Sequence, residues 1–415
     1  MSHSSEVSGR NVCYIVSNEL VKASISSLLP SNKGRSLLVH SLVKAFGLFS
    51  MPPCKHYGRL VVVKPFPADY KDLSVYHSRD YLDHILSPST SSLTSDVNSE
   101  YGLEEDCPYF TGLPEYVRLV AAASLAATDA LCQGHTDISI CWDGGRHHAH
   151  KSYASGFCYV ADCVLAVLSL KRVASSMLTL SSKPRVMYLD LDLHFSDGVS
   201  QAFASSSSGA AVPQILTLSI HHAAPGFFPV SPLSALPDPS SPSFNPFVLS
   251  MPLARGASNT TFARIWPTVE RVKDAFQPNF VVVQCGVDGL AGDPCAIWNW
   301  SLGGVEGSLG WCIERICHEW NCKTLLLGGG GYNSSNVARA WTYLTSIALG
   351  SPIPLESDIP DHDAFPLYAP SFTLDVPSGT MQDQNTEKYL SEVEECFSYV
   401  AGVIEKRLSS ILEHH

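Results

Sequence analysis

The stretch Met187-Tyr-Leu-Asp-Leu-Asp-Leu-His-Phe-Ser-Asp-Gly198 decides the fold of this chain. It begins as an apolar run with the length of a buried strand, and Asp190, Asp192 and His194 follow at every second position. Because side chains alternate along an extended chain, these three point to one side. Without a cation such groups would repel one another or carry a heavy desolvation cost, so the spacing indicates a metal site.

The Asp-x-His pair offers a carboxylate oxygen and an imidazole nitrogen, and zinc accepts this mixture. A catalytic zinc typically has about three protein ligands and leaves its remaining position to water or substrate. Capping of a following helix is the alternative explanation for one such Asp, but it explains three groups at alternating positions poorly.

The apolar run belongs to a series of short runs rich in Val, Ile and Leu, each followed by turn residues. These predicted strands are Arg59–Val63, Ile138–Trp142, Arg185–Asp190, Ile215–Ile220, Phe280–Gln284 and Thr324–Leu327. Helical spacing appears between them at Leu113–Cys132, Phe157–Lys171, Thr261–Phe276, Leu302–Asn321 and Ser335–Leu349. The alternation predicts an α/β fold with one open parallel sheet sandwiched by helices and an active site at the carboxyl ends of the strands.

Three segments break this alternation. Residues 87–100 and 205–208 are rich in Ser, and residues 229–246 combine Pro and Ser without a period. None of them separates two regions that each alternate strand and helix. We therefore predict a polar N-terminal tail (residues 1–10) and one domain over residues 11–415, with these segments as loops.

Two further strand ends carry polar residues suited to a metal site. Asp288 follows the run at 281–284 and is the natural third ligand. This inference depends on the cluster at 190–194, which needs a further metal ligand from another strand end. His147 and His148 follow the run at 138–142 and a pair of glycines. Adjacent histidines cannot easily share one metal, but they can act on one water as acid and base. A pair of ordinary surface histidines is the alternative.

Buried carboxylates would have to set the tautomers of these histidines, and Asp190 and Asp197 are the candidates. A fourth strand end carries four glycines followed by Tyr332. The residues of a phosphate-binding or dinucleotide-binding loop are missing there. The Tyr332 hydroxyl could instead stabilise the oxyanion of a tetrahedral intermediate, although packing alone would also explain this tyrosine.

Composition limits the classes of function. The 415 residues include 27 Lys and Arg against 39 Asp and Glu, a formal net charge of −12, and no basic run occurs. This argues against direct nucleic-acid binding and favours a cationic partner. There is no apolar stretch of ~18 residues and no apolar segment behind the polar N-terminus, so we expect an intracellular protein without a membrane span. The 13 cysteines lack disulfide spacing and indicate reduced thiols.

At this point the chain resembles the class I zinc-dependent histone deacetylases, most nearly the histone deacetylase 8 type with its fungal relatives. The resemblance covers nearly the whole chain and rests on Tyr101–Pro108, Gly144–Ala149, Ala154–Tyr159, Tyr188–His194, Pro225–Pro229, Ala291–Pro294, Gly328–Asn333 and Ile359–His362. It implies an arginase/deacetylase-like fold and hydrolysis of N6-acetyl-lysine in histones or other nuclear proteins. It also implies a role in transcription regulation, in the nucleus with the cytoplasm as a second location.

Position by position, the resemblance implies zinc bound by Asp192, His194 and Asp288, beside His147 and His148. It makes Asp190 a partner of His147 and Asp197 the residue that orients His148. It also implies a structural potassium ion at Asp190, Ser219 and the backbone carbonyls of Asp192 and His194.

The resemblance further implies how substrate binds. Gly156, Phe157 and Phe228 would form a tunnel around the aliphatic stem of acetyl-lysine, and Asp106 would accept hydrogen bonds from the substrate backbone at the rim. Tyr332 would bind substrate through the acetyl oxygen. Arg35 resembles the arginine near an internal acetate exit.

The chain departs from the family pattern at several positions. Phe195 and Ser196 replace a His and a Gly, Arg146 stands where a bulky apolar residue is usual, and His150 replaces a lysine. The Gly-Thr-Gly expected after Phe-Phe-Pro is absent, and residues 230–246 stand there instead. Two alternatives therefore stay open: a deacetylase of acetylpolyamines or other small amides, and a catalytically dead acetyl-lysine-binding scaffold.

Overall fold

The computed structural model describes residues 10–22, 34–50, 59–87, 95–134, 136–173, 183–205 and 213–412. Within these residues eight strands form one sheet in the order β2-β1-β3-β8-β7-β4-β5-β6, and every neighbouring pair is parallel. The strands are β1 (Val12–Ile15), β2 (Leu60–Val63), β3 (Ile138–Cys141), β4 (Val186–Asp190), β5 (Ile215–His222), β6 (Val248–Leu253), β7 (Phe280–Gln284) and β8 (Lys323–Leu327). The predicted open parallel α/β fold is confirmed.

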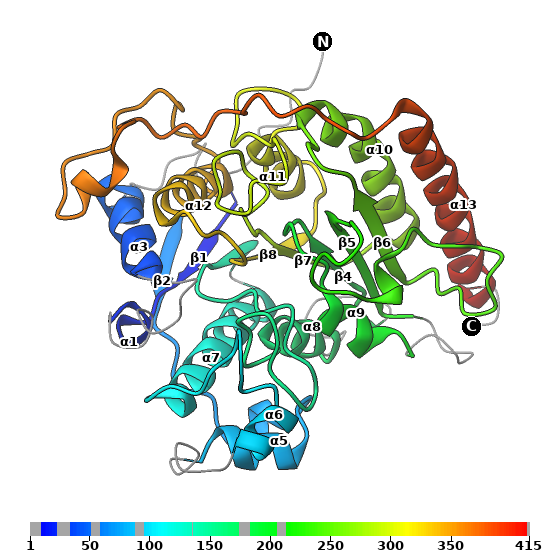
Figure 1. The fold of residues 1–415 in the computed structure, drawn as a ribbon, viewed down its shortest axis with the longest axis horizontal. Helices are drawn as coiled ribbons and strands as arrows, with labels where there is room; N and C mark the ends of the chain where they lie inside the picture. Colours follow the sequence, from blue (N-terminus) through cyan, green and yellow to red (C-terminus); the bar gives the residue numbers. More distant parts are fainter. Residues whose placement is uncertain are drawn as a thin grey trace.

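Helices cover both faces of the sheet (Figure 1). One face carries α3 (Arg35–Ala45), α10 (Asn259–Phe276), α11 (Leu309–His318) and α12 (Ser334–Ala348), with α13 (Glu387–Leu412) packed outside α10. The other face carries α7 (Leu113–Cys132), α8 (Asp162–Lys171) and α9 (Asp197–Phe203), with α5 (Arg79–Ile85) and α6 (Ser95–Glu100) beyond α7. Shorter elements are α1 (Asn18–Val21), α4 (Tyr70–Leu73) and the 3-10 turns η2 (Leu48–Ser50), η5 (Pro232–Ser234) and η6 (Phe365–Tyr368).

The apolar core is divided by the sheet into two layers. In β4, Met187 and Leu189 face the layer beneath α10, α11 and α12, whereas Val186 and Tyr188 face the layer beneath α7 and α8. Because both faces are buried, each central strand is apolar at almost every position. This explains why the strands appear in the sequence as continuous apolar runs.

Two strands and several boundaries were not predicted from sequence. β1 is only four residues long, and β6 follows the Pro- and Ser-rich segment and contains Pro252, which an edge strand tolerates. The helix predicted from Phe157 begins at Asp162, and the one predicted over 302–321 spans Leu309–His318. Glycines 303, 304 and 307 hold the preceding segment in an irregular path, because two of them adopt positive φ.

The loop predicted over 87–100 is partly wrong, since Ser95–Glu100 forms α6. Six residues are too few to show a helical apolar period, so the serine content dominated the prediction. Residues 88–94 and 206–208 lie outside the described residues, as does nearly all of the predicted N-terminal tail. Residues 229–246 contain no strand, and η5 is the helical turn found in them.

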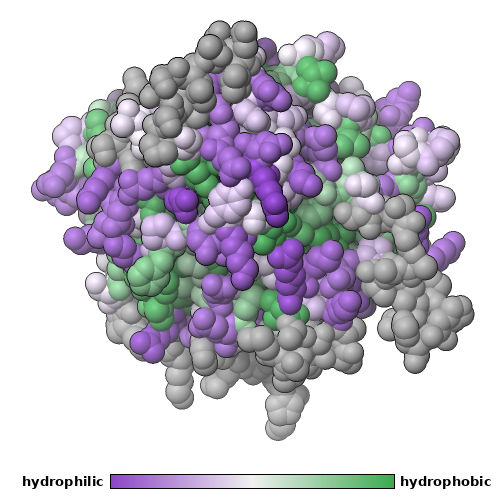
Figure 2. Space-filling view, turned by 90° about the horizontal axis from the view of Figure 1, so that it is seen from below, coloured by the Kyte–Doolittle hydropathy of each residue, from purple (hydrophilic) through white to green (hydrophobic). Residues whose placement is uncertain are grey.

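The strand order places the polar loops together. β3, β8, β7 and β4 are consecutive neighbours at the centre of the sheet, and all four are parallel. Their carboxyl ends therefore open on one edge, although the segments that follow them are far apart in sequence. On the side of the molecule seen in Figure 2, hydrophilic residues alternate with patches of hydrophobic ones. No helix among the described residues has the length and apolar content needed to cross a bilayer.

Candidate active site

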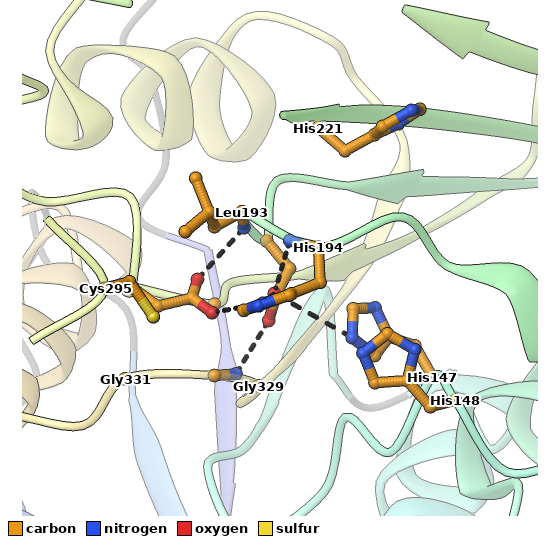
Figure 3. Close-up of polar contacts among 12 residues, drawn as sticks. His147, His148, Leu193, His194, His221, Cys295, Gly329 and Gly331 are labelled. Carbon is orange, nitrogen blue, oxygen red and sulfur yellow. Dashed lines mark hydrogen bonds and ion pairs between the residues drawn. The ribbon is translucent and has the colours of Figure 1, made fainter. Parts of the chain in front are cut away.

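A carboxylate–imidazole cluster lies at the carboxyl ends of β4 and β7 (Figure 3). The Nδ1 atom of His194 is 2.9 Å from Oδ2 of Asp288 and 3.3 Å from Oδ1 of Asp192. Both carboxylates are buried. The structure thus brings together the three residues predicted to bind zinc.

Backbone and amide donors fix both carboxylates in place. The Leu193 amide donates to Oδ1 of Asp288 over 2.9 Å. The Gly330 amide and the Gln284 side chain donate to Oδ2 of Asp192 over 2.7 and 2.8 Å. A side chain at position 330 would collide with both carboxylates, so the glycine run after β8 is required for this approach.

The charges of the cluster fit a divalent cation. Burial and the negative charge of Asp192 raise the pKa of Asp288 to about 7. Burial also opposes ionisation of Asp192, yet the charge of His147 and the hydrogen bond from His194 hold its pKa well below the usual value. Hydrogen bonds to the two carboxylates outweigh burial and raise the pKa of His194 to about 10. Two buried carboxylates around an imidazole nitrogen form a donor set that suits zinc.

Cys295 is a fourth potential ligand that the sequence analysis missed. One ligating atom each from His194, Asp288 and Cys295 lies within 4.8 Å of the other two. Figure 3 shows the Cys295 sulfur on the side of His194 opposite to His147 and His148. The sequence predicted only that the cysteines are reduced thiols. Its position just after Asp293-Pro294, beside the third predicted ligand, was the available signal.

The paired histidines each contact a carboxylate through Nδ1. His147 Nδ1 is 2.9 Å from Oδ2 of Asp190, and His148 Nδ1 is 2.7 Å from Oδ1 of Asp197. The two imidazole rings lie 3.9 Å apart, and both line one small cavity. Because each Nδ1 is engaged by a carboxylate, each Nε2 is left for chemistry in the cavity.

The two histidines differ in charge. Burial lowers the pKa of His147, but the charges of Asp190 and Asp192 outweigh burial and raise it to about 9. Burial and the neighbouring positive charge of His147 lower the pKa of His148 to about 4. At neutral pH and without a bound metal, His147 therefore carries a proton and His148 is a neutral base.

Tyr332 lines the same cavity at the end of the glycine run. Its backbone amide donates to Oδ2 of Asp293 over 2.8 Å, and its ring centroid is 6.4 Å from that of His194. Burial raises the pKa of the Tyr332 hydroxyl well above its usual value. The phenol is therefore a hydrogen-bond donor at physiological pH.

Two of the predicted tunnel residues line this cavity. Gly156 and Phe157 both line it and both adopt positive φ, 53° and 63°. A side chain at position 156 would collide with the His148 ring, and a left-handed Phe is a strained conformation typical of functional sites. The Phe228 ring lies 4.9 Å from the His148 ring and is 41% exposed. Asp106 accepts a hydrogen bond from the Gly156 amide over 2.8 Å, so its carboxylate fixes the backbone of this cavity residue.

The predicted potassium residues lie next to the cluster. Asp190 and Ser219 are paired in register on β4 and β5, and both are buried. Ser219 Oγ is 3.4 Å from the Ser196 amide and 3.1 Å from Nδ1 of His221. The hydroxyls of Ser196 and Thr217 are buried and have no hydrogen-bond partner among the described residues. Potassium binding here stays a prediction.

The departures from the family pattern fall on both sides of the pocket. Phe195 is buried against the ring of His221 and does not line the cavity, and Ser196 precedes α9. His150 lies 3.1 Å from the second oxygen of Asp197, so it contacts the partner of His148. Arg146, in contrast, lines the cavity itself, as does Arg35, which donates to the carbonyls of Gly329 and Gly331.

One parallel sheet with this cluster at its carboxyl edge is consistent with the arginase/deacetylase fold. A family model for the histone deacetylase domain matches residues 29–348, and the chain belongs to the histone deacetylase family. The predicted resemblance to class I is confirmed.

Individual relatives agree with this assignment. Histone deacetylase 8 of Danio rerio is 36% identical over 386 residues, which cover 92% of this chain and 93% of that protein. Histone deacetylase 8 of Xenopus tropicalis is 36% identical over 384 residues, 92% and 95% of the two chains. Histone deacetylase 1 of Homo sapiens is 34% identical over 389 residues, 93% of this chain and 74% of that protein.

Proposed function

We propose that this chain is a zinc-dependent protein lysine deacetylase, which hydrolyses N6-acetyl-lysine to lysine and acetate. The observation that carries the proposal is the cluster of Asp192, His194 and Asp288. Its Asp192 lines the same cavity as the paired histidines and Tyr332. Asp192, His194 and Asp288 would hold the metal. When bound, zinc supplies a Lewis acid that polarises the acetyl carbonyl and lowers the pKa of water.

The chain's own residues supply the proton transfers and the oxyanion contact. His148, neutral and oriented by Asp197, accepts the proton of the attacking water. The Tyr332 hydroxyl donates to the carbonyl oxygen as it gains negative charge. The imidazolium that forms on His148 then gives its proton to the leaving lysine amine, while Asp190 holds His147 through Nδ1. A potassium ion bound at Asp190 and Ser219 would stabilise the carboxyl end of β4, where Asp190 contacts His147.

An acetylated protein is the substrate we favour. Phe157 and Phe228 offer aromatic surfaces to an aliphatic lysine stem, and Asp106 stands beside this tunnel. Histone tails or another acetylated nuclear protein would supply such a lysine on an extended backbone. We therefore place the enzyme in chromatin and transcription regulation, as a repressor in the nucleus and also the cytoplasm.

Hydrolysis of acetyl-lysine peptides by metal-free and zinc-reconstituted protein tests the proposal. We expect zinc to restore turnover, a hydroxamate chelator to stop it, and Asp288→Ala to lose both zinc and activity. Acetylspermidine serves as the comparison substrate, because a small-amide hydrolase would prefer it to peptides. Turnover that is indifferent to zinc would contradict the proposal, and folded zinc protein without any turnover would favour a binding module.

A further inference from the structure

Cys295 brings a thiol to the carboxylate–imidazole cluster, and the proposed proton transfers do not use it. One ligating atom each of Cys295, His194 and Asp288 lies within 4.8 Å of the other two. Within the described part of the chain, no other group of three His, Cys, Asp or Glu side chains meets this distance. Cys295 is half-buried, so its sulfur is at the edge of the core rather than sealed inside it.

The backbone of Cys295 is fixed beside the cluster by a neighbouring carboxylate. Oδ1 of Asp293 accepts a hydrogen bond from the Cys295 amide over 3.0 Å. Oδ2 of the same carboxylate accepts one from the Tyr332 amide over 2.8 Å. Ala296, the next residue, adopts a left-handed φ of 49°, so the chain turns directly after the thiol. The loop therefore holds Cys295 in a fixed place relative to the end of the glycine run.

The thiol lies on the side of the cluster away from the paired histidines. Figure 3 shows the Cys295 sulfur on the side of His194 opposite to His147 and His148. Those two histidines line the reaction cavity, whereas Cys295 does not. An ion in the cluster could therefore contact this sulfur and still keep a position open toward the cavity, where water and substrate would bind.

A thiol at this place changes the kind of metal site that the cluster would form. Thiolate is a soft ligand that suits zinc, whereas carboxylates also serve hard ions such as Mg²⁺ and Mn²⁺. Catalytic zinc commonly has three protein ligands and can expand from four ligands to five. A thiolate added to two carboxylates and an imidazole would strengthen the hold on zinc without taking the position of the water.

We propose that Cys295 is a fourth protein ligand of the metal, in a mixed centre with Asp192, His194 and Asp288. The inference rests on the proposed function, because it adds a ligand to the zinc that the deacetylase reaction requires. The role of the thiolate is to retain zinc and to select it over harder divalent ions. The thiol gives its proton to solvent as the metal–sulfur bond forms, so the step needs no oxidant or reductant.

Cobalt(II) substitution tests the metal–sulfur bond directly and requires no turnover. A cobalt–thiolate bond gives a charge-transfer band in the near ultraviolet, which carboxylate and imidazole ligands do not give. We expect this band in the cobalt-loaded wild type and its loss in Cys295→Ser and Cys295→Met. It should persist in Cys132→Ser, a matched control at another half-buried cysteine. X-ray absorption of the zinc-loaded wild type should show a sulfur ligand at about 2.3 Å.

Zinc affinity, measured against a competing chelator, gives the second readout. Cys295→Ser should bind zinc at least tenfold more weakly than the wild type, whereas Cys132→Ser should bind it equally well. The preference for zinc over Mn²⁺ should fall in Cys295→Ser, because a hydroxyl oxygen does not discriminate against hard ions as a thiolate does. Hydroxamate binding at saturating zinc reports whether the pocket of each variant is folded.

A cobalt-loaded wild type without the charge-transfer band would overturn the inference. An unchanged band or an unchanged zinc affinity in a folded Cys295→Ser variant would do the same. Failure of the proposed function looks different. It would appear as absent acetyl-lysine turnover by the zinc-loaded wild type, whether or not sulfur is bound to the metal.

Discussion

At the scale of single residues, two carboxylates decide how the paired histidines can act. Asp190 lies in strand β4 and Asp197 begins helix α9, and each contacts one Nδ1. Burial lowers the pKa of His148, and the charge on His147, whose ring centroid is 3.9 Å away, lowers it further. One strand and one helix thereby give two adjacent, chemically identical side chains different protonation states.

Replacing Asp197 by Asn should separate orientation from metal binding. The Asn retains the size of the side chain but removes the charge that orients His148, so kcat for acetyl-lysine peptide should fall by roughly 10²–10⁴-fold. Zinc content should not change, because Asp197 is not one of the proposed ligands. A variant within twofold of the wild-type kcat would contradict the role assigned to Asp197.

The residues of the candidate site could largely be predicted because they occupy strand ends at simple spacings. Asp190, Asp192 and His194 follow the two-residue period of an extended chain, and the structure places them together. Cys295 and Arg146 could not be placed in this way. Both residues lie in irregular loops, whose path determines whether their side chains reach the pocket. The spacing of residues in the sequence does not predict such a path.

At the scale of elements, one buried histidine anchors the loop that carries His147 and His148. His77, just before α5, is buried, and its Nδ1 is 3.2 Å from the carbonyl of Lys151. Its Nε2 accepts from the Ala161 amide over 3.1 Å. This pairing requires the neutral imidazole with its proton on Nδ1, and burial lowers the pKa of His77 to about 4.

The pH dependence of stability should report this anchor. The unfolded chain binds a proton at His77 below its ordinary pKa of 6.5, whereas the folded chain does so only near 4, so stability rises with pH between these values. The contribution is at most about 3 kcal/mol and is lost as pH falls from 6.5 to 4. Denaturant titrations at several pH values should show a flatter profile for His77→Gln, and equal slopes would contradict the assignment.

Strands could be predicted from the sequence where both faces of the strand are buried. β4 and β7 sit at the centre of the sheet, are buried throughout, and appear as continuous apolar runs. β6 escaped prediction because an edge strand with Pro252 follows a Pro- and Ser-rich segment, so its local composition indicates a loop. Helix α8 begins at Asp162, later than the predicted Phe157, since Gly156 and Phe157 line the pocket in left-handed conformations.

At the scale of the whole molecule, the sheet order assembles the site and concentrates buried charge there. Asp192 and Asp288 come from β4 and β7, which are neighbours in the sheet although nearly a hundred residues separate the two side chains in the chain. Burial, together with repulsion from Asp192, keeps the pKa of Asp288 raised. A cation at this edge would remove that repulsion and tie the two halves of the sheet together.

Zinc should therefore stabilise the entire fold. A ligand that binds only the folded state at 100 times its Kd adds about 2.7 kcal/mol, so calorimetry should show a higher unfolding temperature with zinc than with chelator. Asp288→Ala should lose most of this zinc-dependent increase. An unfolding temperature indifferent to zinc would mean that the cluster does not bind the ion in the folded protein.

The central claim is that these strand ends form a zinc-dependent deacetylase site, and Tyr332→Phe tests it most directly. The measurement is acetate release from an acetyl-lysine peptide by the zinc-loaded wild type and by this variant, which removes a single oxygen atom. We predict turnover by the wild type, and a loss of about 10²–10³-fold in kcat in the variant at unchanged zinc content. Undiminished turnover by Tyr332→Phe would contradict the account.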